Sequence, residues 1–156
     1  MRNKRGQVGI EYLMIIGFVT LAIMTTILIA YFYMGGMQDK IKADQVEKYA
    51  ENIINSADSV FFAGHPTKTS ITAYLPDSVN EIKIVNDENG YPRLLVVDYH
   101  LSTGDEVVSF RSRVDLAQAS TDLDDPSNPF GTTAISKGMK RLVIEARGSD
   151  VLIKRV

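Results

Sequence analysis

The stretch VGIEYLMIIGFVTLAIMTTILIAYFYM, residues 8–34, carries one ionisable side chain besides its tyrosines, the carboxylate of Glu11. An α-helix of these 27 residues would be about 40 Å long, which exceeds the roughly 30 Å hydrocarbon core of a bilayer. We therefore predict that residues 8–34 form a membrane-spanning helix. The rest of the chain has to be organised around this segment.

Three basic side chains, Arg2, Lys4 and Arg5, stand directly before the apolar stretch. Positive charge beside a span is typical of its cytoplasmic end, so we expect a cytoplasmic N-terminus and a C-terminus outside. A general secretory signal has the same charge order but a shorter apolar region that ends in a small-x-small cleavage site. After Ala30 the chain reads YFYMGGM, which lacks that pattern.

Helical periodicity continues after Gly35-Gly36 with a different character. Apolar residues recur at steps of three and four and form one stripe, while charged residues fall elsewhere; the stripe is Val46, Tyr49, Ala50, Ile53, Ala57 and Val60. We predict one helix over residues 7–61, apolar on all sides over 8–34 and amphipathic over 37–60. The stripe is expected to pack against the open face of a sheet.

The period changes at Gly64-His65-Pro66, and short runs rich in β-branched residues follow. These runs are SITAYL, EIKIV, RLLVVDYHL, EVVSFRSRVDL, KRLVIEA and VLIKRV. Turn signals such as Asn89-Gly90 separate them, which favours antiparallel hairpins. We predict an α+β protein: the long hydrophobic helix, then a small antiparallel β-sheet or sandwich domain over residues 67–156. Residues 117–138 are polar and contain two prolines, which indicates a surface loop.

Composition excludes several classes of function. The 156 residues include no cysteine, so neither disulfides nor thiolate metal sites are available. After the first six residues the chain has 14 basic against 19 acidic side chains, which argues against nucleic acid as a partner. No nucleophile elbow, phosphate loop or dinucleotide fingerprint occurs, and we expect no enzymatic activity and no cofactor.

Metal ligation is not predicted either. His65 lies in a turn and His100 in a strand, each without a nearby cysteine or second histidine. The sequence TDLDDPSN places Asp122, Asp124 and Asp125 close together as hard oxygen ligands, but it lacks the glycine and distal glutamate of an EF-hand loop. A solvated acidic loop is the better interpretation of these residues.

Glu11 has two interpretations when its neighbours are ignored. A carboxylate near the middle of a bilayer costs about 2.5–3.5 kcal/mol, so such a residue usually marks a site or a pairing partner. Glu11, however, lies only about one turn inside the span, where a long side chain can reach the headgroups. Both interpretations remain open at this point.

The residues around Glu11 resemble the class III signal peptide of archaeal type IV pilin-like proteins. That family has a short basic leader, a cleavage point between Gly and Gln, and a Q-x-S-x-E-x-x-x-L pattern that opens the helix. Here Gln7 matches the first position and Glu11 the fifth, whereas Gly9 stands in place of Ser and Ile15 in place of Leu. The complete recognition motif would be Arg5, Gly6, Gln7, Gly9, Glu11 and Ile15. The resemblance covers about the first 35 residues in sequence and the remainder in architecture only.

The resemblance implies a fold, a processing step and a set of partners. A class III prepilin peptidase would remove residues 1–6, cutting between Gly6 and Gln7, and a pilus assembly ATPase with its membrane platform would polymerise the mature subunits. The fold would be a pilin-like lollipop, and the filament a helical homo-oligomer on the cell surface. The new amine of Gln7 could then pair with Glu11 on the same or a neighbouring helix, where a low dielectric strengthens the attraction. Glu11 would thus set register during assembly.

Other interpretations of the same residues stay open. Within surface filaments these are an archaeal flagellin and a minor pilin or pseudopilin. Outside them, the chain could be a single-span, membrane-anchored β-domain that binds an extracellular partner. Adhesion, motility and DNA uptake are all compatible with these residues.

Overall fold

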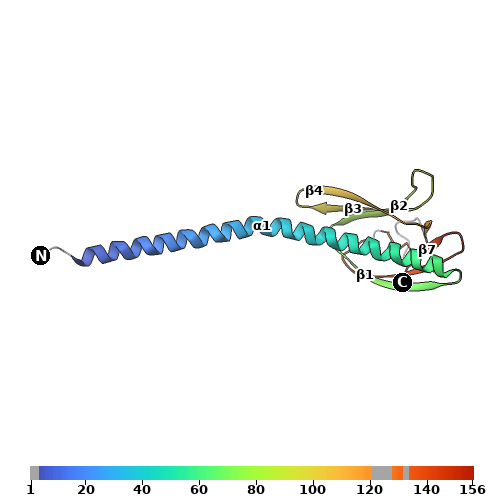
Figure 1. Ribbon diagram of the computed structural model, residues 1–156, viewed down its shortest axis with the longest axis horizontal. Helices are drawn as coiled ribbons and strands as arrows, with labels where there is room; N and C mark the ends of the chain where they lie inside the picture. The colour runs from blue at the N-terminus through green and yellow to red at the C-terminus, as the bar shows by residue number, and fades with distance from the viewer. Residues whose placement is uncertain (1–3, 121–127, 132–133) are drawn as a thin grey trace. The chain divides into compact units, whose positions relative to one another are not determined.

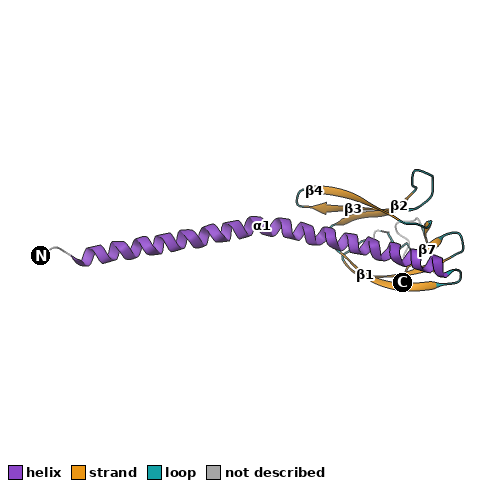
Figure 2. Cartoon of the chain, viewed as in Figure 1, coloured by secondary structure: helices purple, strands orange, loops and turns teal. Residues whose placement is uncertain are grey.

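The chain forms two compact units, residues 1–38 and 39–156. A computed structural model describes residues 4–120, 128–131 and 134–156, with side chains from residue 9 onward (Figures 1 and 2). The first unit contains only helix. The second contains the continuation of that helix and all seven strands of the described part. This confirms a long N-terminal apolar helix followed by β-sheets.

Helix α1 spans Lys4–Ala63. It begins three residues before the predicted start and ends two residues after the predicted end, and it continues through Gly35 and Gly36. Gly64 follows with a φ of 83°, and its N–H donates to the carbonyl of Phe61 at 3.0 Å. Glycine reaches this left-handed conformation at little steric cost, so Gly64 ends the helix.

The strands form two sheets in the second unit. The four-stranded sheet has the order β1-β6-β7-β5, and the three-stranded sheet has the order β2-β3-β4. Their bounds are β1 Lys68–Leu75, β2 Val79–Val85, β3 Leu94–Leu101, β4 Gly104–Arg111, β5 Leu116–Gln118, β6 Gly138–Ala146 and β7 Val151–Arg155. All pairs are antiparallel except β5 with β7, which is parallel.

The prediction of antiparallel hairpins is confirmed for three pairs and wrong for two. β2–β3, β3–β4 and β6–β7 are antiparallel neighbours in sequence. β1, however, pairs with β6 about 70 residues later, and β5 joins β7 in parallel, so the domain is mixed rather than purely antiparallel. Alternation identifies which face of a strand is buried but does not specify its neighbour, because many strands with one apolar face could pair with it.

The predicted strand 106–116 is interrupted at Ser112. This residue is buried; its hydroxyl accepts a hydrogen bond from the Val114 N–H at 3.1 Å and lies 3.3 Å from a carboxylate oxygen of Asp58 on α1. The chain turns there and leaves the three-stranded sheet, and β5 begins at Leu116 in the other sheet. A polar residue within an apolar run thus marks the change of sheet.

The predicted apolar stripe forms the centre of the core. All six of its residues are at most 3% exposed, and they pack in one cluster with the inner faces of both sheets. The sheets contribute residues that alternate along each strand, among them Ala73, Leu75, Leu95, Val97, Leu142, Ile144, Val151 and Ile153. Residues 39–63 of α1 are therefore part of the folded domain as well as an extension of the apolar segment.

The prediction of a surface loop over residues 117–138 is wrong for those residues of its second half that the structure describes. Asn128, Phe130 and Ala134 are at most 3% exposed, and Phe130 belongs to the core. The side-chain oxygen of Asn128 accepts the Phe130 N–H at 2.9 Å, which satisfies a buried polar group. The segment of 22 residues is polar on average, so its composition does not reveal that Phe130 is buried.

The core position of the stripe can be tested at Ile53. Its side chain is fully buried, so Ile53→Ala should lower the free energy of unfolding by about 2–5 kcal/mol. Asn52→Ala, one residue away on the exposed face, should change it by less than about 0.5 kcal/mol. Denaturant unfolding of the full chain in detergent, followed by near-UV circular dichroism, measures both. Equal effects would contradict the packing of the stripe.

Candidate assembly segment

The first unit presents an apolar surface that nothing in the described chain covers. Every residue from 9 to 38 is exposed, including Phe18 and Phe32 at about three quarters of their full area. Soluble monomers rarely expose continuous apolar patches larger than a few hundred Å². We call residues 9–34 the assembly segment, because this surface requires lipid or other protein around it.

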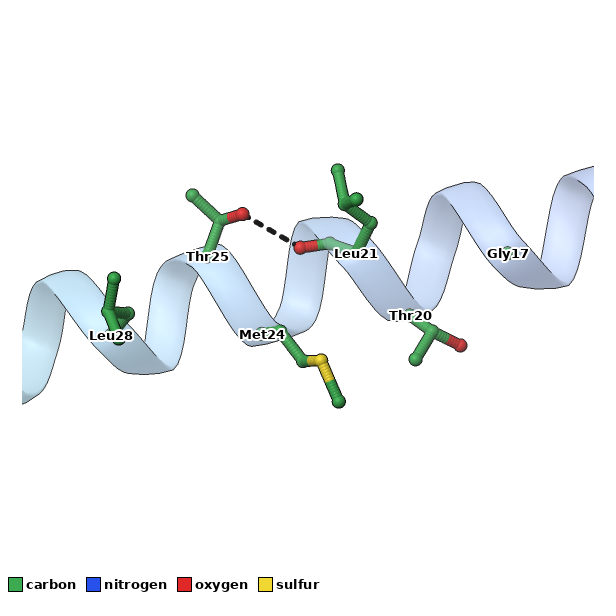
Figure 3. A pocket seen from close by; sticks show the side chains of 6 residues that line it. All are labelled: Gly17, Thr20, Leu21, Met24, Thr25 and Leu28. Carbon is green, nitrogen blue, oxygen red and sulfur yellow. Dashed lines mark hydrogen bonds between the residues drawn. The ribbon is translucent and has the colours of Figure 1, made fainter.

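Two polar side chains of the assembly segment are satisfied within the helix. Thr25 donates its hydroxyl to the Leu21 carbonyl at 2.8 Å (Figure 3). Thr26 donates to the Ala22 carbonyl at 2.9 Å. These bonds stay within the helix, so neither hydroxyl needs water. In hydrocarbon, backbone and side-chain polar groups have to be satisfied in this internal way.

Two shallow grooves run along the assembly segment. One is lined by Gly17, Thr20, Leu21, Met24, Thr25 and Leu28 (Figure 3). The other is lined by Phe18, Val19, Ala22, Ile23, Thr26 and Ile27. At about 100° per residue the two sets are centred on opposite sides of the helix. The segment thus presents a shallow apolar groove on each of two sides.

Gly17 has open space beside its Cα. A methyl group placed there would meet no atom within 4 Å apart from its chain neighbours and the nearby backbone of its own helix. Glycine in a helix interior costs about 0.5–1 kcal/mol relative to alanine, and here no internal contact offsets that cost. A close approach by another helix is one use of such a glycine, and glycines are also common in membrane helices generally.

Glu11 is the only charged side chain between Gly6 and Gln38. It is exposed on α1, and it has no hydrogen-bond or ion-pair partner among the side chains that the structure describes. Its predicted partner, the amine of Gln7, exists only after cleavage. The structure thus places Glu11 on an apolar surface and does not test the pairing.

The residues of the predicted motif all lie near the start of α1, between Lys4 and Ile15. Arg5, Gly6 and Gln7 are helical, and Gly9 and Ile15 are exposed along the following turns. The bond between Gly6 and Gln7 thus lies in the first turn, where the N–H groups lack intrahelical partners.

The histidines have local structural partners. His65 Nδ1 lies 2.9 Å from the carbonyl oxygen of Ala146, and His100 Nδ1 lies 2.7 Å from the Asp105 carboxylate. Within the described ranges, no group of three metal-ligating side chains comes together. Asp122, Asp124 and Asp125, the predicted acidic cluster, lie outside the described residues.

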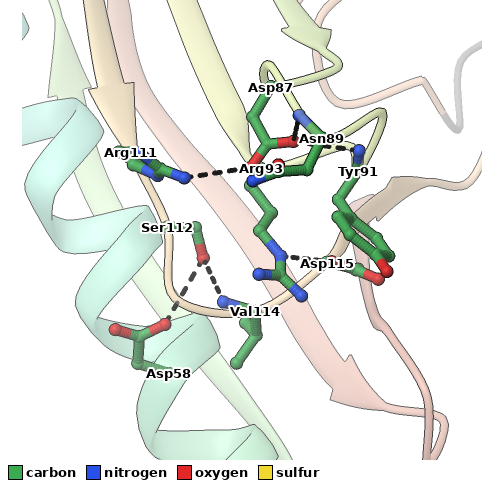
Figure 4. Close-up of polar contacts among 9 residues, drawn as sticks. All are labelled: Asp58, Asp87, Asn89, Tyr91, Arg93, Arg111, Ser112, Val114 and Asp115. Atoms are coloured by element: carbon green, nitrogen blue, oxygen red, sulfur yellow. Dashed lines mark hydrogen bonds and ion pairs between the residues drawn. The ribbon is translucent and has the colours of Figure 1, made fainter.

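A polar network in the second unit was not found by sequence reasoning. Asp87, whose side chain is 3% exposed, accepts hydrogen bonds from the Asn89 and Tyr91 N–H groups and pairs with Arg111 at 3.1 Å (Figure 4). The Tyr91 bond is the largest of the causes that lower the pKa of Asp87. Because its members are spread over residues 87–115, no short motif reveals this network.

Arg93 forms the second half of this network. Its guanidinium pairs with Asp115 at 2.5 Å and lies 4.6 Å above the Tyr91 ring (Figure 4). The hydrogen bond to Asp115 raises the pKa of Arg93. These contacts join the loop between β2 and β3 to Arg111 and Asp115.

Asp39 ties the start of the second unit to the β3–β4 turn. Its carboxylate accepts the hydroxyl of Ser102 and also the Ser102 N–H, at 3.2 and 3.3 Å for the two oxygens. The hydroxyl hydrogen bond is the main cause that lowers the pKa of Asp39. This contact lies close to the boundary between the two units, at residues 38 and 39.

The class of this protein is defined by its fold and its apolar helix, because comparison with known proteins gives no match. No protein-family model, curated protein or solved structure matches the chain. The described part contains one helix that is long and apolar enough to cross a membrane. The fold and the site therefore define an α+β protein whose N-terminal helix is compatible with a membrane anchor.

The contact between Asp39 and Ser102 gives a pH-dependent prediction. A lowered carboxyl pKa stabilises the folded state above the unfolded pKa, and this contribution is lost as the pH falls through the folded pKa. Ser102→Ala removes the hydroxyl donor and should raise the midpoint of the Asp39 carboxyl titration, observed by carboxyl-carbon NMR. Thr103→Ala is the control in the same turn. An unchanged midpoint in Ser102→Ala would refute the assignment.

Proposed function

We propose that this chain is the precursor of an archaeal type IV pilin-like subunit, a structural protein without enzymatic activity. A class III prepilin peptidase would cut it after Gly6, and the mature subunits would polymerise into a surface filament. The observation that carries the proposal is the combination of an uncovered apolar helix with one carboxylate, Glu11, five positions into the predicted mature chain.

The physical case for polymerisation rests on the two environments that the assembly segment can occupy. In the precursor, lipid covers an apolar helix of this length. In a filament, the same side chains would be buried against copies of themselves, which stabilises by about 25 cal/mol for each Å² removed from water. The grooves on opposite sides of the helix favour contacts that continue rather than close.

Glu11 would act in assembly. Once water is excluded, an unpaired carboxylate is costly, and a Gln7 amine from the same or a neighbouring subunit offsets that cost. No other charged side chain is present between Gly6 and Gln38 to make an alternative pair. A subunit that docks out of register would leave Glu11 unpaired, so the pair would select the register.

A membrane-anchored binding domain is the competing candidate. It is favoured by a groove on the second unit that is rich in amide and hydroxyl groups. The groove is lined by Asn52, Asn55, Ser56, Ser59, Val60, Thr67, Lys68 and Thr69. Such a surface could bind a polar ligand without any polymerisation. The two candidates differ in the fate of the N-terminus.

The first test is the N-terminal sequence of protein recovered from sheared surface filaments and from membranes. We expect filaments to start at Gln7. Gly6→Leu should block processing and leave the intact Met1 leader in the membrane fraction. Gly9→Ser, which restores the usual family residue, should be processed like the parent chain. An uncleaved leader in the parent, found only in membranes, would rule out the proposal.

The second test concerns the charge of Glu11. Glu11→Gln keeps the size of the side chain and removes its charge, so we expect normal membrane insertion and a fall in filament yield of more than about tenfold. Glu11→Asp keeps the charge and should retain more yield than Glu11→Gln. Filament protein is quantified by immunoblot of the sheared fraction against the membrane fraction. Normal yield from Glu11→Gln would remove the assembly role.

A further inference from the structure

Strand β4 is an open edge without the bulge, the proline or the short length that protects many sheet edges. β2, at the other side of the same sheet, has a bulge between Val79 and Glu81, and an ion pair between Glu81 and Lys83. β5 has only three residues. β4 instead pairs with β3 over eight residues in an unbroken register and contains no proline, and Val107 is 63% exposed. Long, regular, partly apolar edges of this kind template the addition of another strand.

The hydrogen-bonding groups of β4 alternate between β3 and the open edge. Ser112 donates its N–H to the Arg93 carbonyl at 2.8 Å, so even-numbered positions bond to β3. In an antiparallel pair the positions between them direct their N–H and C=O groups the other way. The groups that face the open edge therefore belong to Asp105, Val107, Ser109 and Arg111.

The side chains of these four residues lie on the outer face of the sheet. Val108 and Phe110 pack against the core, so the odd-numbered neighbours point outward. Asp105 and Arg111 are both about two-thirds exposed, near opposite ends of the strand. The edge thus carries an acid near one end, a base at the other, and Val107 and Ser109 between them.

We propose that β4 pairs in an antiparallel manner with β4 of a second copy of this chain, with Val108 opposite its own counterpart. This register opposes Asp105 to Arg111 of the second copy, and by symmetry it does so twice. Val107 then lies opposite Ser109 of the second copy, and every open N–H and C=O group of the four residues finds a partner. Opposite charges directly across two strands stabilise the pair, and like charges destabilise it.

The existing contacts of the two charged residues do not prevent this pairing. Asp105 lies 2.7 Å from His100 and Arg111 lies 3.1 Å from Asp87. A carboxylate has several acceptor positions and a guanidinium has five N–H donors, so each can contact two groups. β1, the other long regular edge, contains Lys68 but no acidic residue, so the same self-pairing there would gain no ion pair.

The symmetry of the pairing indicates which copies would meet. The two-fold axis is perpendicular to the sheet, so residues 39–63 of α1 run in opposite directions in the two copies. The partner would therefore belong to a facing filament or surface rather than to the adjacent subunit. One strand edge buries less than the roughly 1,200–2,000 Å² of stable complexes, so each contact is weak and many copies would act together. The inference does not depend on polymerisation through the assembly segment.

Charge reversal tests this pairing in the full chain, held in detergent micelles and followed by sedimentation equilibrium up to millimolar concentration. Asp105→Arg and Arg111→Asp should each lower the association constant by about tenfold or more, because both pairs become repulsive. The double variant should recover to within about threefold of the parent. The matched control is Glu81→Lys with Lys83→Glu on the β2 edge, which should leave association unchanged.

A distance measurement tests the same pairing without changing any charge, so it remains valid if a charge variant unfolds. Because the chain has no cysteine, Thr103→Cys accepts a single spin label with all charges of the edge intact. In the proposed register the two labelled backbones are about 35 Å apart, since ten residues separate them along the strands. A monomeric parent, a different distance, or no recovery in a folded double variant would overturn the proposal. Loss of processing at Gly6 would not affect it.

Discussion

The uncovered apolar surface of residues 9–34 is the constraint on which the rest of this protein depends. Its side chains are exposed on all sides of α1, and the hydroxyls of Thr25 and Thr26 bond within the helix. Water is a poor solvent for such a surface, so the free energy of the chain is lowest when lipid or other helices surround it. Glu11 is the one charged side chain on that surface.

The second unit has a core of its own. The buried stripe of α1 begins at Val46 and ends at Val60, and the partly buried Ala43 and Phe61 also pack against the core. Between the two regions lies the contact of Asp39 with the β3–β4 turn. The second unit therefore carries its own core, while the apolar surface of residues 9–34 contributes nothing to it.

Local sequence patterns predicted most of the helix and strands but little of how the strands pair. The period of 3.6 in residues 46–60 identified the buried face of the helix correctly, because burial follows directly from this period. The partner of β1 and the parallel β5–β7 pair could not be predicted, since they depend on which strands can cover the same helix stripe. Phe130 was missed because it is a single anchor in a polar segment. The network around Asp87 was missed because its members are distant in sequence.

The sequence by itself determined that a long helix with an apolar first half precedes a β-rich domain, and it determined where the one carboxylate of that half lies. These features depend on composition and period over neighbouring residues. Only the tertiary structure decided the strand order, the change of sheet at Ser112 and the open edge at β4. These depend on contacts between residues far apart in the chain, where many pairings satisfy the same local pattern and only the packing of the whole core selects one.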